Sequence, residues 1–165
     1  MPAALPVPIE FDLPEGWLPA KPDGLDPDAV AFAAVHPRPD GGFAANITID
    51  GGLPAEEETL EGLAEESVRR LAGSAGPVEV VQRREVGSDD APALIQRLAF
   101  RAVAGGVRRD LVQSQVYLVM ADVADPRRRA VIRLALTATA GQHDEVLGEF
   151  QDFVSSVRPD TGTEA

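Results

Sequence analysis

Hydrophobic residues recur along this chain with two spacings, every second residue in some stretches and every third or fourth residue in others. The first stretch, residues 7–13, alternates apolar residues with proline and acidic residues. This pattern predicts a strand at the edge of a sheet, where proline is tolerated. A Pro-Glu-Gly turn follows, and behind it stands Trp17, the only tryptophan in the sequence. We expect this large apolar side chain to close one end of the core.

Two short apolar runs come next, at residues 29–35 and 43–50. Between them, residues 36–42 are rich in proline, glycine and aspartate, which favour turns. The two runs are therefore expected to pair as a hairpin of strands.

The spacing changes to that of a helix over residues 54–71. One apolar stripe recurs at steps of three and four residues, formed by Leu60, Leu63, Ala64, Val68 and Leu71. Pro54 and the glutamates after it suit the first turn of a helix, and Arg69 and Arg70 suit the last. Gly73 is the expected C-terminal cap.

Four extended segments follow, at residues 77–86, 91–103, 110–120 and 130–139. The connections between them are too short to contain crossover helices, so we expect these strands to form an antiparallel meander. A second amphipathic helix is predicted over residues 142–157, with its apolar side packed on the sheet. Residues 160–165 are polar and are expected to be a disordered tail.

The length and composition fit one domain with a substantial core. The chain has 165 residues, of which 44% are hydrophobic and 25% are charged, as in ordinary globular proteins. We therefore predict a single α+β domain over residues 1–159, built on an antiparallel β-sheet flanked by helices.

This arrangement resembles the PsbP-like superfamily over nearly the whole chain. Three features carry the resemblance: the opening residues Phe11, Leu13, Pro14, Gly16 and Trp17; the strand at residues 43–49 before an acidic helix; and the closing residues Phe150, Phe153, Val154, Val157 and Arg158. The resemblance implies an α/β/α sandwich. It also implies a binding function, since the superfamily includes LpqN-type lipoproteins and EagR-type chaperones, which shield hydrophobic segments of secreted toxins.

The charge of the chain narrows the choice of partners. The formal net charge is -12, which opposes nucleic acid or an anionic membrane as the main partner. Of the 15 basic residues, 14 are arginine and one is Lys21, a bias that suggests a GC-rich bacterial genome. The first nine residues have neither a basic start nor a continuous apolar stretch, and no segment is apolar over the length of a membrane span. We expect a cytoplasmic protein without stable membrane insertion.

The sequence offers little catalytic chemistry. It contains no cysteine, and its two histidines, His36 and His143, lack the spacing of a metal site. Ser114, His143 and Asp144 supply the side-chain types of a catalytic triad, but no serine lies in a Gly-x-Ser-x-Gly motif. No phosphate-binding or dinucleotide-binding glycine motif is present. We therefore expect a non-enzymatic protein without a cofactor or metal.

A binding surface is suggested by the alternation of residues in the meander. If neighbouring strands pair in ordinary hairpin register, one sheet face is apolar and the other collects polar residues. The collected residues are Arg97, Arg101, Gln113, Gln115, Tyr117 and Arg133. Such a face would suit a neutral-to-acidic protein or peptide. Alternatively, its arginines only neutralise nearby carboxylates on a solvated sheet.

Two functional hypotheses remain. The first is a non-enzymatic protein-interaction module, such as a cytoplasmic chaperone or adaptor for a secreted or membrane-targeted client. The second is a module that binds a small ligand or lipid in an apolar cavity, for which the low aromatic content of 5% could leave space. Homodimerisation through an open sheet edge or the apolar end near Trp17 also stays open.

Overall fold

The computed structural model describes residues 9–19, 31–54, 58–88, 91–104, 106–121 and 129–159. Its elements are β1 (Ile9–Glu10), β2 (Leu18–Pro19), β3 (Phe32–Val35), β4 (Asn46–Gly52), α1 (Leu60–Ala75), β5 (Val78–Gly87), β6 (Pro92–Ala104), β7 (Val107–Ala121), β8 (Arg129–Thr139), α2 (His143–Ser156) and β9 (Arg158–Pro159). The predicted tail at 160–165 lies outside the described residues, as do residues 29–30 of the second predicted strand.

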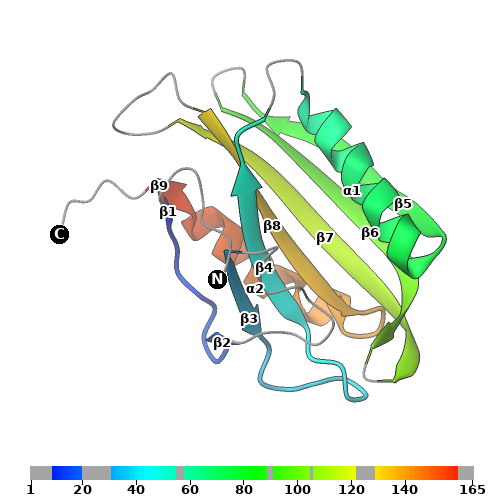
Figure 1. The fold of residues 1–165 in the computed structure, drawn as a ribbon. Coiled ribbons are helices and arrows are strands. Elements are labelled where there is room, and N and C mark those ends of the chain that lie inside the picture. Colours follow the sequence, from blue (N-terminus) through cyan, green and yellow to red (C-terminus); the bar gives the residue numbers. More distant parts are fainter. Residues whose placement is uncertain are drawn as a thin grey trace.

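Seven strands form one antiparallel sheet in the order β2-β3-β4-β8-β7-β6-β5 (Figure 1). The last four strands of this sheet along the chain, β5 to β8, each pair with their sequence neighbours, so the predicted meander is confirmed. The predicted hairpin is also confirmed, since β3 pairs with β4. β4 then pairs with β8 and joins the hairpin to the meander.

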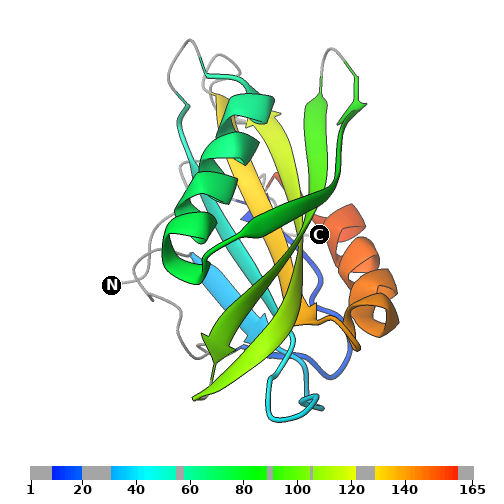
Figure 2. The ribbon, with the colours of Figure 1, turned by 90° about the vertical axis from the view of Figure 1, so that its right-hand side faces the viewer.

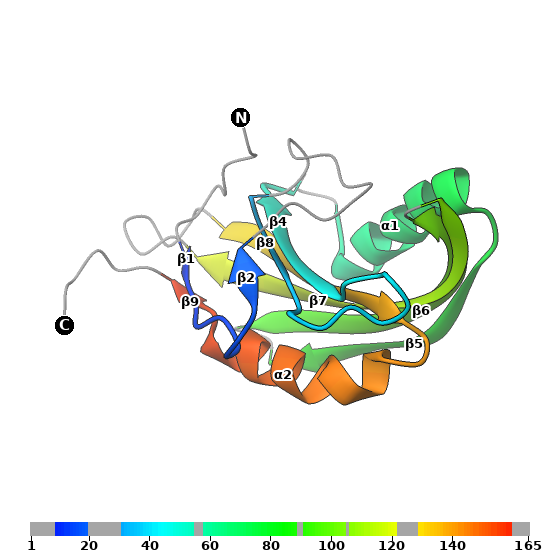
Figure 3. The ribbon, with the colours of Figure 1, turned by 90° about the horizontal axis from the view of Figure 1, so that it is seen from below.

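The two helices cover opposite faces of this sheet, which gives the expected α/β/α sandwich (Figures 2 and 3). α2 packs against β8 and the β4 side of the sheet, over a core that includes Phe150, Phe153 and Leu134. α1 packs against β5 and β6 on the other face, over two smaller apolar clusters. Within the described residues, neither helix is long and apolar enough to cross a membrane.

The hairpin between β6 and β7 determines which side chains share a face. Ala104 pairs with Val107, so the loop has two residues, and Gly106 takes the positive φ of 76° that such a tight turn requires. This pairing places even-numbered residues of β6 opposite odd-numbered residues of β7. Side chains at even positions of β6 therefore lie on the α1 face together with those at odd positions of β7.

The first helix begins and ends later than the sequence pattern predicts. Pro54, predicted in the first turn, lies before the helix, and Thr59 caps the N-terminus: its Oγ1 accepts a hydrogen bond of 3.0 Å from the backbone N–H of Gly62. Gly73 lies inside the helix, and Gly76 ends it with φ of 94°. The glutamate-rich predicted start, residues 55–57, lies outside the described residues.

The N-terminal stretch differs from the predicted edge strand. Residues 1–8 lie outside the described residues, and β1 pairs with β9 in a separate two-stranded sheet, not with the main sheet. Phe11 and Leu13 nevertheless pack against the α2-side core. Trp17 is buried there as expected, with its ring edge-on to His36 at a centroid distance of 5.1 Å.

Candidate functional site

The six residues predicted to form one polar surface lie on two faces of the sheet. Arg97 and Arg101 lie on the α2 face, and the other four lie on the α1 face. The expectation of one shared face is wrong because the two-residue hairpin pairs Arg97 with Ser114 and not with Gln113 or Gln115. The α1 face is also covered, since Gln115 and Tyr117 are buried beneath α1. These six residues therefore do not form one surface that could bind a neutral-to-acidic protein or peptide.

Two of the predicted arginines neutralise carboxylates instead. Arg101 Nε donates to Asp110 Oδ1 at 2.7 Å, and both side chains are exposed. Arg133 donates to Asp50 Oδ2 through Nε at 3.0 Å and Nη2 at 2.7 Å, and Nη1 donates to Ser67 Oγ on α1. Burial opposes the charge of Arg133, but Asp50 and Tyr117 outweigh it and raise the pKa of Arg133 above its ordinary value.

A buried polar network joins the middle of α1 to the sheet. Gln115 Oε1 accepts hydrogen bonds from Gln96 Nε2 at 2.6 Å and from the Tyr117 hydroxyl at 2.9 Å. Gln115 Nε2 donates to Ser67 Oγ at 3.0 Å, and Gln96 Nε2 also donates to the Ala64 carbonyl at 3.2 Å. Because these buried groups satisfy one another across two elements, the network holds α1 in one position on the sheet.

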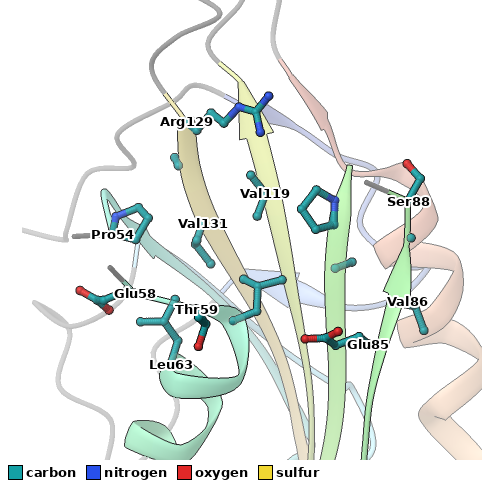
Figure 4. Close-up of a pocket in the computed structure, with 15 residues that line it drawn as sticks. Pro54, Glu58, Thr59, Leu63, Glu85, Val86, Ser88, Val119, Arg129 and Val131 are labelled. Carbon is teal, nitrogen blue, oxygen red and sulfur yellow. The ribbon is translucent and has the colours of Figure 1, made fainter. Parts of the chain in front are cut away.

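An open groove lies next to this network, between the first turn of α1 and the ends of β5 to β8 (Figure 4). Its volume is about 870 Å³. The floor is apolar and comes from both the helix and the strands, with Leu60, Leu63, Val119 and Val131. All four belong to or pack against the same core cluster as Tyr117, so the groove is an open end of the α1-side core.

The rim of the groove is polar. Figure 4 shows Val119 and Val131 in the centre, with Glu58 on the α1 side, Glu85 on the β5 side and Arg129 at the end of β8. An apolar floor inside a polar rim is the arrangement found in protein–protein interfaces. The groove is held firmly because Tyr117, in the floor cluster, also donates to the buried network.

Sequence reasoning missed this groove, although the pattern contained a signal for it. In β7, the α1-facing positions 113, 115 and 117 are polar or aromatic, and position 119 is valine. Its partner across the sheet is Val131, followed two residues later by Arg133. This switch from polar to apolar along one face marks the end of the covered network and the start of the groove floor.

The α2 face contains a smaller cavity, of about 320 Å³, between α2 and strands β5 to β7. Apolar side chains of the sheet and helix form most of its wall, among them Ile95, Val116, Leu147 and Val154. Arg97 and Ser114 also line it, directly opposite each other in the β6–β7 register. This cavity is the kind of space that the small-ligand hypothesis requires.

The side chains considered as a catalytic triad do meet beside this cavity. Ser114 Oγ lies 2.8 Å from His143 Nε2, and His143 Nδ1 lies 3.3 Å from Asp144 Oδ1. Burial lowers the pKa of His143, and the charge of Arg97 lowers it further, while the hydrogen bond to Asp144 acts in the opposite direction. The arrangement is that of a neutral imidazole that accepts from Ser114 and donates to Asp144.

This trio lacks the other parts of a hydrolase site. Ser114 lies in the middle of β7, an inner strand paired on both sides, so the backbone N–H groups around it belong to the sheet. An oxyanion hole needs such donors aimed at the reacting atom. Asp144 is 92% exposed, whereas the acid of a working triad is buried. We interpret the trio as an anchor that fixes the start of α2 to the sheet.

Metal ligands do not gather elsewhere in the part of the chain that the structure describes, where no group of three or more histidine or acidic side chains could hold an ion. Two acidic pairs of the sequence, at positions 26 and 28 and at positions 89 and 90, lie outside the described residues.

Comparison with known proteins identifies the fold. No family model and no curated protein matches the chain. Solved structures do match. The Ran-binding protein Mog1p of Saccharomyces cerevisiae superposes with a TM-score of 0.60 at 14% identity, over 95% of this chain and 93% of that one. LpqN of Mycobacterium tuberculosis, which is involved in cell envelope biogenesis, superposes with a TM-score of 0.59 at 12% identity, over 92% of this chain and 84% of that one.

The cyanobacterial PsbP protein of a Synechocystis species also matches, with a TM-score of 0.53 at 19% identity, over 92% of this chain and 86% of that one. At these identities the likeness concerns the fold. The chain therefore has a PsbP-like fold, as the sequence resemblance implied.

Proposed function

We propose that this chain, which has the PsbP-like fold, is a non-enzymatic protein-interaction module that holds a protein segment in the groove beside α1. The observation that carries the proposal is the groove itself, with its apolar floor at Leu63, Val119 and Val131 and its polar rim. Apolar side chains of a partner would bury against this floor, and burial of apolar surface is the main favourable term in association.

The shape and rigidity of the groove support a protein partner. The groove is open along the ends of four strands, which suits an extended or helical segment. The buried network beneath it fixes α1, so the surface needs little rearrangement before binding, and this reduces the entropy cost of association.

The charge of the chain supports a neutral or basic segment as the partner. The net charge is -12, and the groove rim carries Glu58 and Glu85 against Arg129. A basic segment would be steered toward such a surface, and nucleic acid would be repelled. The superposed protein Mog1p binds Ran, which shows that this fold can serve a protein partner.

The finer role we propose is that of a chaperone or adaptor for a secreted or membrane-targeted client, acting in the cytoplasm. Such a client exposes apolar segments before it reaches its destination, and the groove floor offers a matching apolar surface. Fractionation of the native host with an antibody against the chain tests the cytoplasmic location.

Affinity purification from the native host, followed by mass spectrometry, tests the proposed function. The groove variant carries Glu85→Arg and Ser88→Arg, two exposed positions that line the groove. The matched control carries Glu79→Arg and Ser74→Arg, which are also exposed but lie away from the groove. We expect a partner that is retained by the wild type and the control and lost from the groove variant. A partner retained equally by all three proteins would contradict the proposed site.

A further inference from the structure

The cavity on the α2 face has the composition of a small-molecule site. Its volume of about 320 Å³ lies in the range of pockets that bind small ligands. Apolar side chains of β6, β7 and α2 form most of the wall, and Arg97 is the one charged residue among the described residues that line it. A molecule that matches this lining is largely apolar and carries one group that can pair with Arg97.

Arg97 is the unusual group in this cavity. Its Nε is buried, and no hydrogen-bond partner for it occurs among the residues that the structure describes. No carboxylate among those residues lies within ion-pair distance of it, whereas Arg101, four residues along the same face, pairs with Asp110. Buried donors are nearly always satisfied, and a partly buried cation without a counterion is costly. Arg97 therefore offers a buried donor and a positive charge, for which an anionic ligand is a suitable partner.

The described residues next to Arg97 add no second positive charge to the site. Ser114 faces it across the β6–β7 ladder and is fixed by its hydrogen bond to His143. Burial lowers the pKa of His143, so its imidazole is neutral at neutral pH and adds no second charge. Ser114 directs its proton to His143, so of the described lining residues Arg97 alone supplies the positive charge, and this matches a ligand with a single charge of −1.

We propose that this cavity binds a small monocarboxylate with an apolar tail, with the carboxylate at Arg97 and the tail between α2 and the sheet. A guanidinium presents its N–H donors in a planar fork that matches a carboxylate. A phosphate monoester would bring nearly two negative charges to one cation, which fits less well. The tail would bury apolar surface of Ile95, Val116 and Leu147.

This site is separate from the groove. The cavity lies under α2 and the groove lies beside α1, on the opposite face of the sheet, although Val86 and Ala93 at the β5–β6 edge contribute to both. The monocarboxylate proposal therefore does not depend on the protein-binding proposal, and each can fail without the other.

Isothermal titration with octanoate and with 1-octanol tests the proposal, since the two share a tail and differ in charge. The variant Arg97→Gln keeps an amide donor but removes the charge, and Arg101→Gln is the matched control on the same face of the same strand. We expect octanoate to bind the wild type and Arg101→Gln equally, and to bind Arg97→Gln about ten- to a hundredfold more weakly. Octanol should bind all three proteins alike. No saturable octanoate binding to the wild type, or equal binding to Arg97→Gln, would overturn the proposal.

The position of the tail is tested separately. Leu147→Trp fills the cavity from α2 and should abolish binding of both octanoate and octanol, with the fold checked by near-ultraviolet circular dichroism. Methyl NMR of the wild type needs no substitution. Octanoate should shift the methyl resonances of Ile95, Val116, Leu147 and Val154, and shifts concentrated on any other part of the protein would show that the tail binds elsewhere.

Discussion

Replacement of Gln115 by leucine is the sharpest test of the buried network that holds α1 on the sheet. Gln115 is 1% exposed, and its amide contacts Gln96, Gln113, Tyr117 and Ser67 through hydrogen bonds. Leucine has a similar volume but no polar atoms, so the substitution removes the hydrogen bonds without opening a large cavity.

The cost follows from which partners are left without a hydrogen bond. Gln96 keeps the Ala64 carbonyl, and Ser67 still accepts from Arg133, so these two are partly compensated. The Tyr117 hydroxyl, which is buried, loses the partner it donates to, and Gln113 Oε1 loses its donor. Each buried group left unsatisfied costs about 1–3 kcal/mol, so we expect a loss of about 2–4 kcal/mol in the free energy of unfolding.

Urea denaturation followed by circular dichroism measures this loss. Addition of Tyr117→Phe to Gln115→Leu removes the stranded hydroxyl, so the double variant should be less destabilised than the sum of the two single variants by about 1 kcal/mol. A Gln115→Leu variant as stable as the wild type, or strictly additive single effects, would refute the view that this network fixes α1.

Four further outcomes are expected. Asp50→Asn should destabilise the protein by about 2 kcal/mol in urea denaturation because it leaves the Arg133 charge without its counterion. This value lies below that of a fully buried pair because the side chains of Asp50 and Arg133 are 22% and 23% exposed. An unchanged midpoint would contradict this. The pKa of His143 is lower in the folded than in the unfolded chain, so the unfolded chain binds the proton more readily. The contribution of neutral His143 to stability is therefore present above about pH 6.5 and is lost as the pH falls toward the folded pKa. The free energy of unfolding, measured between about pH 7.5 and 5.5, should depend less on pH in His143→Gln than in the wild type. A slope as steep as that of the wild type would rule out this role. Thr59→Ala should lower stability by about 1 kcal/mol through loss of the α1 cap, and a neutral effect would show that the cap is dispensable. Finally, the purified protein should hydrolyse p-nitrophenyl acetate no faster than Ser114→Ala does, and turnover that depends on Ser114 would contradict the anchor interpretation.

The fold could be predicted because its signals are local. The periodicities of the helices and the short connections of the meander each depend on neighbouring residues, and these predictions are confirmed by the strand order. The helix ends were less predictable. Pro54 suits a first turn and Gly73 a C-terminal cap by residue type, but the helix starts after Thr59 and ends at Gly76, since its ends depend on where the tertiary contacts of α1 begin and end.

The candidate sites depended on long-range pairing, which local patterns do not contain. The prediction of a shared polar face failed at a single step, the loop length between β6 and β7, because a shift of one residue in register moves every side chain to the other face. The polar residues of β7 were correctly grouped with Arg133. That α1 covers them, and that Arg97 lies alone over a cavity on the opposite face, follows only from the three-dimensional arrangement.

Photo-crosslinking from the groove tests the central claim most directly. A photoreactive amino acid is placed at Glu85, which lines the groove, or at Arg84, the neighbouring exposed residue of β5 whose side chain lies on the other face of the sheet. Irradiation in the native host, followed by mass spectrometry, then identifies what lies within reach of each position. We predict that one protein partner is captured from position 85 and not from position 84. Capture of the same partner from both positions, or from position 84 alone, would contradict the groove as the binding site.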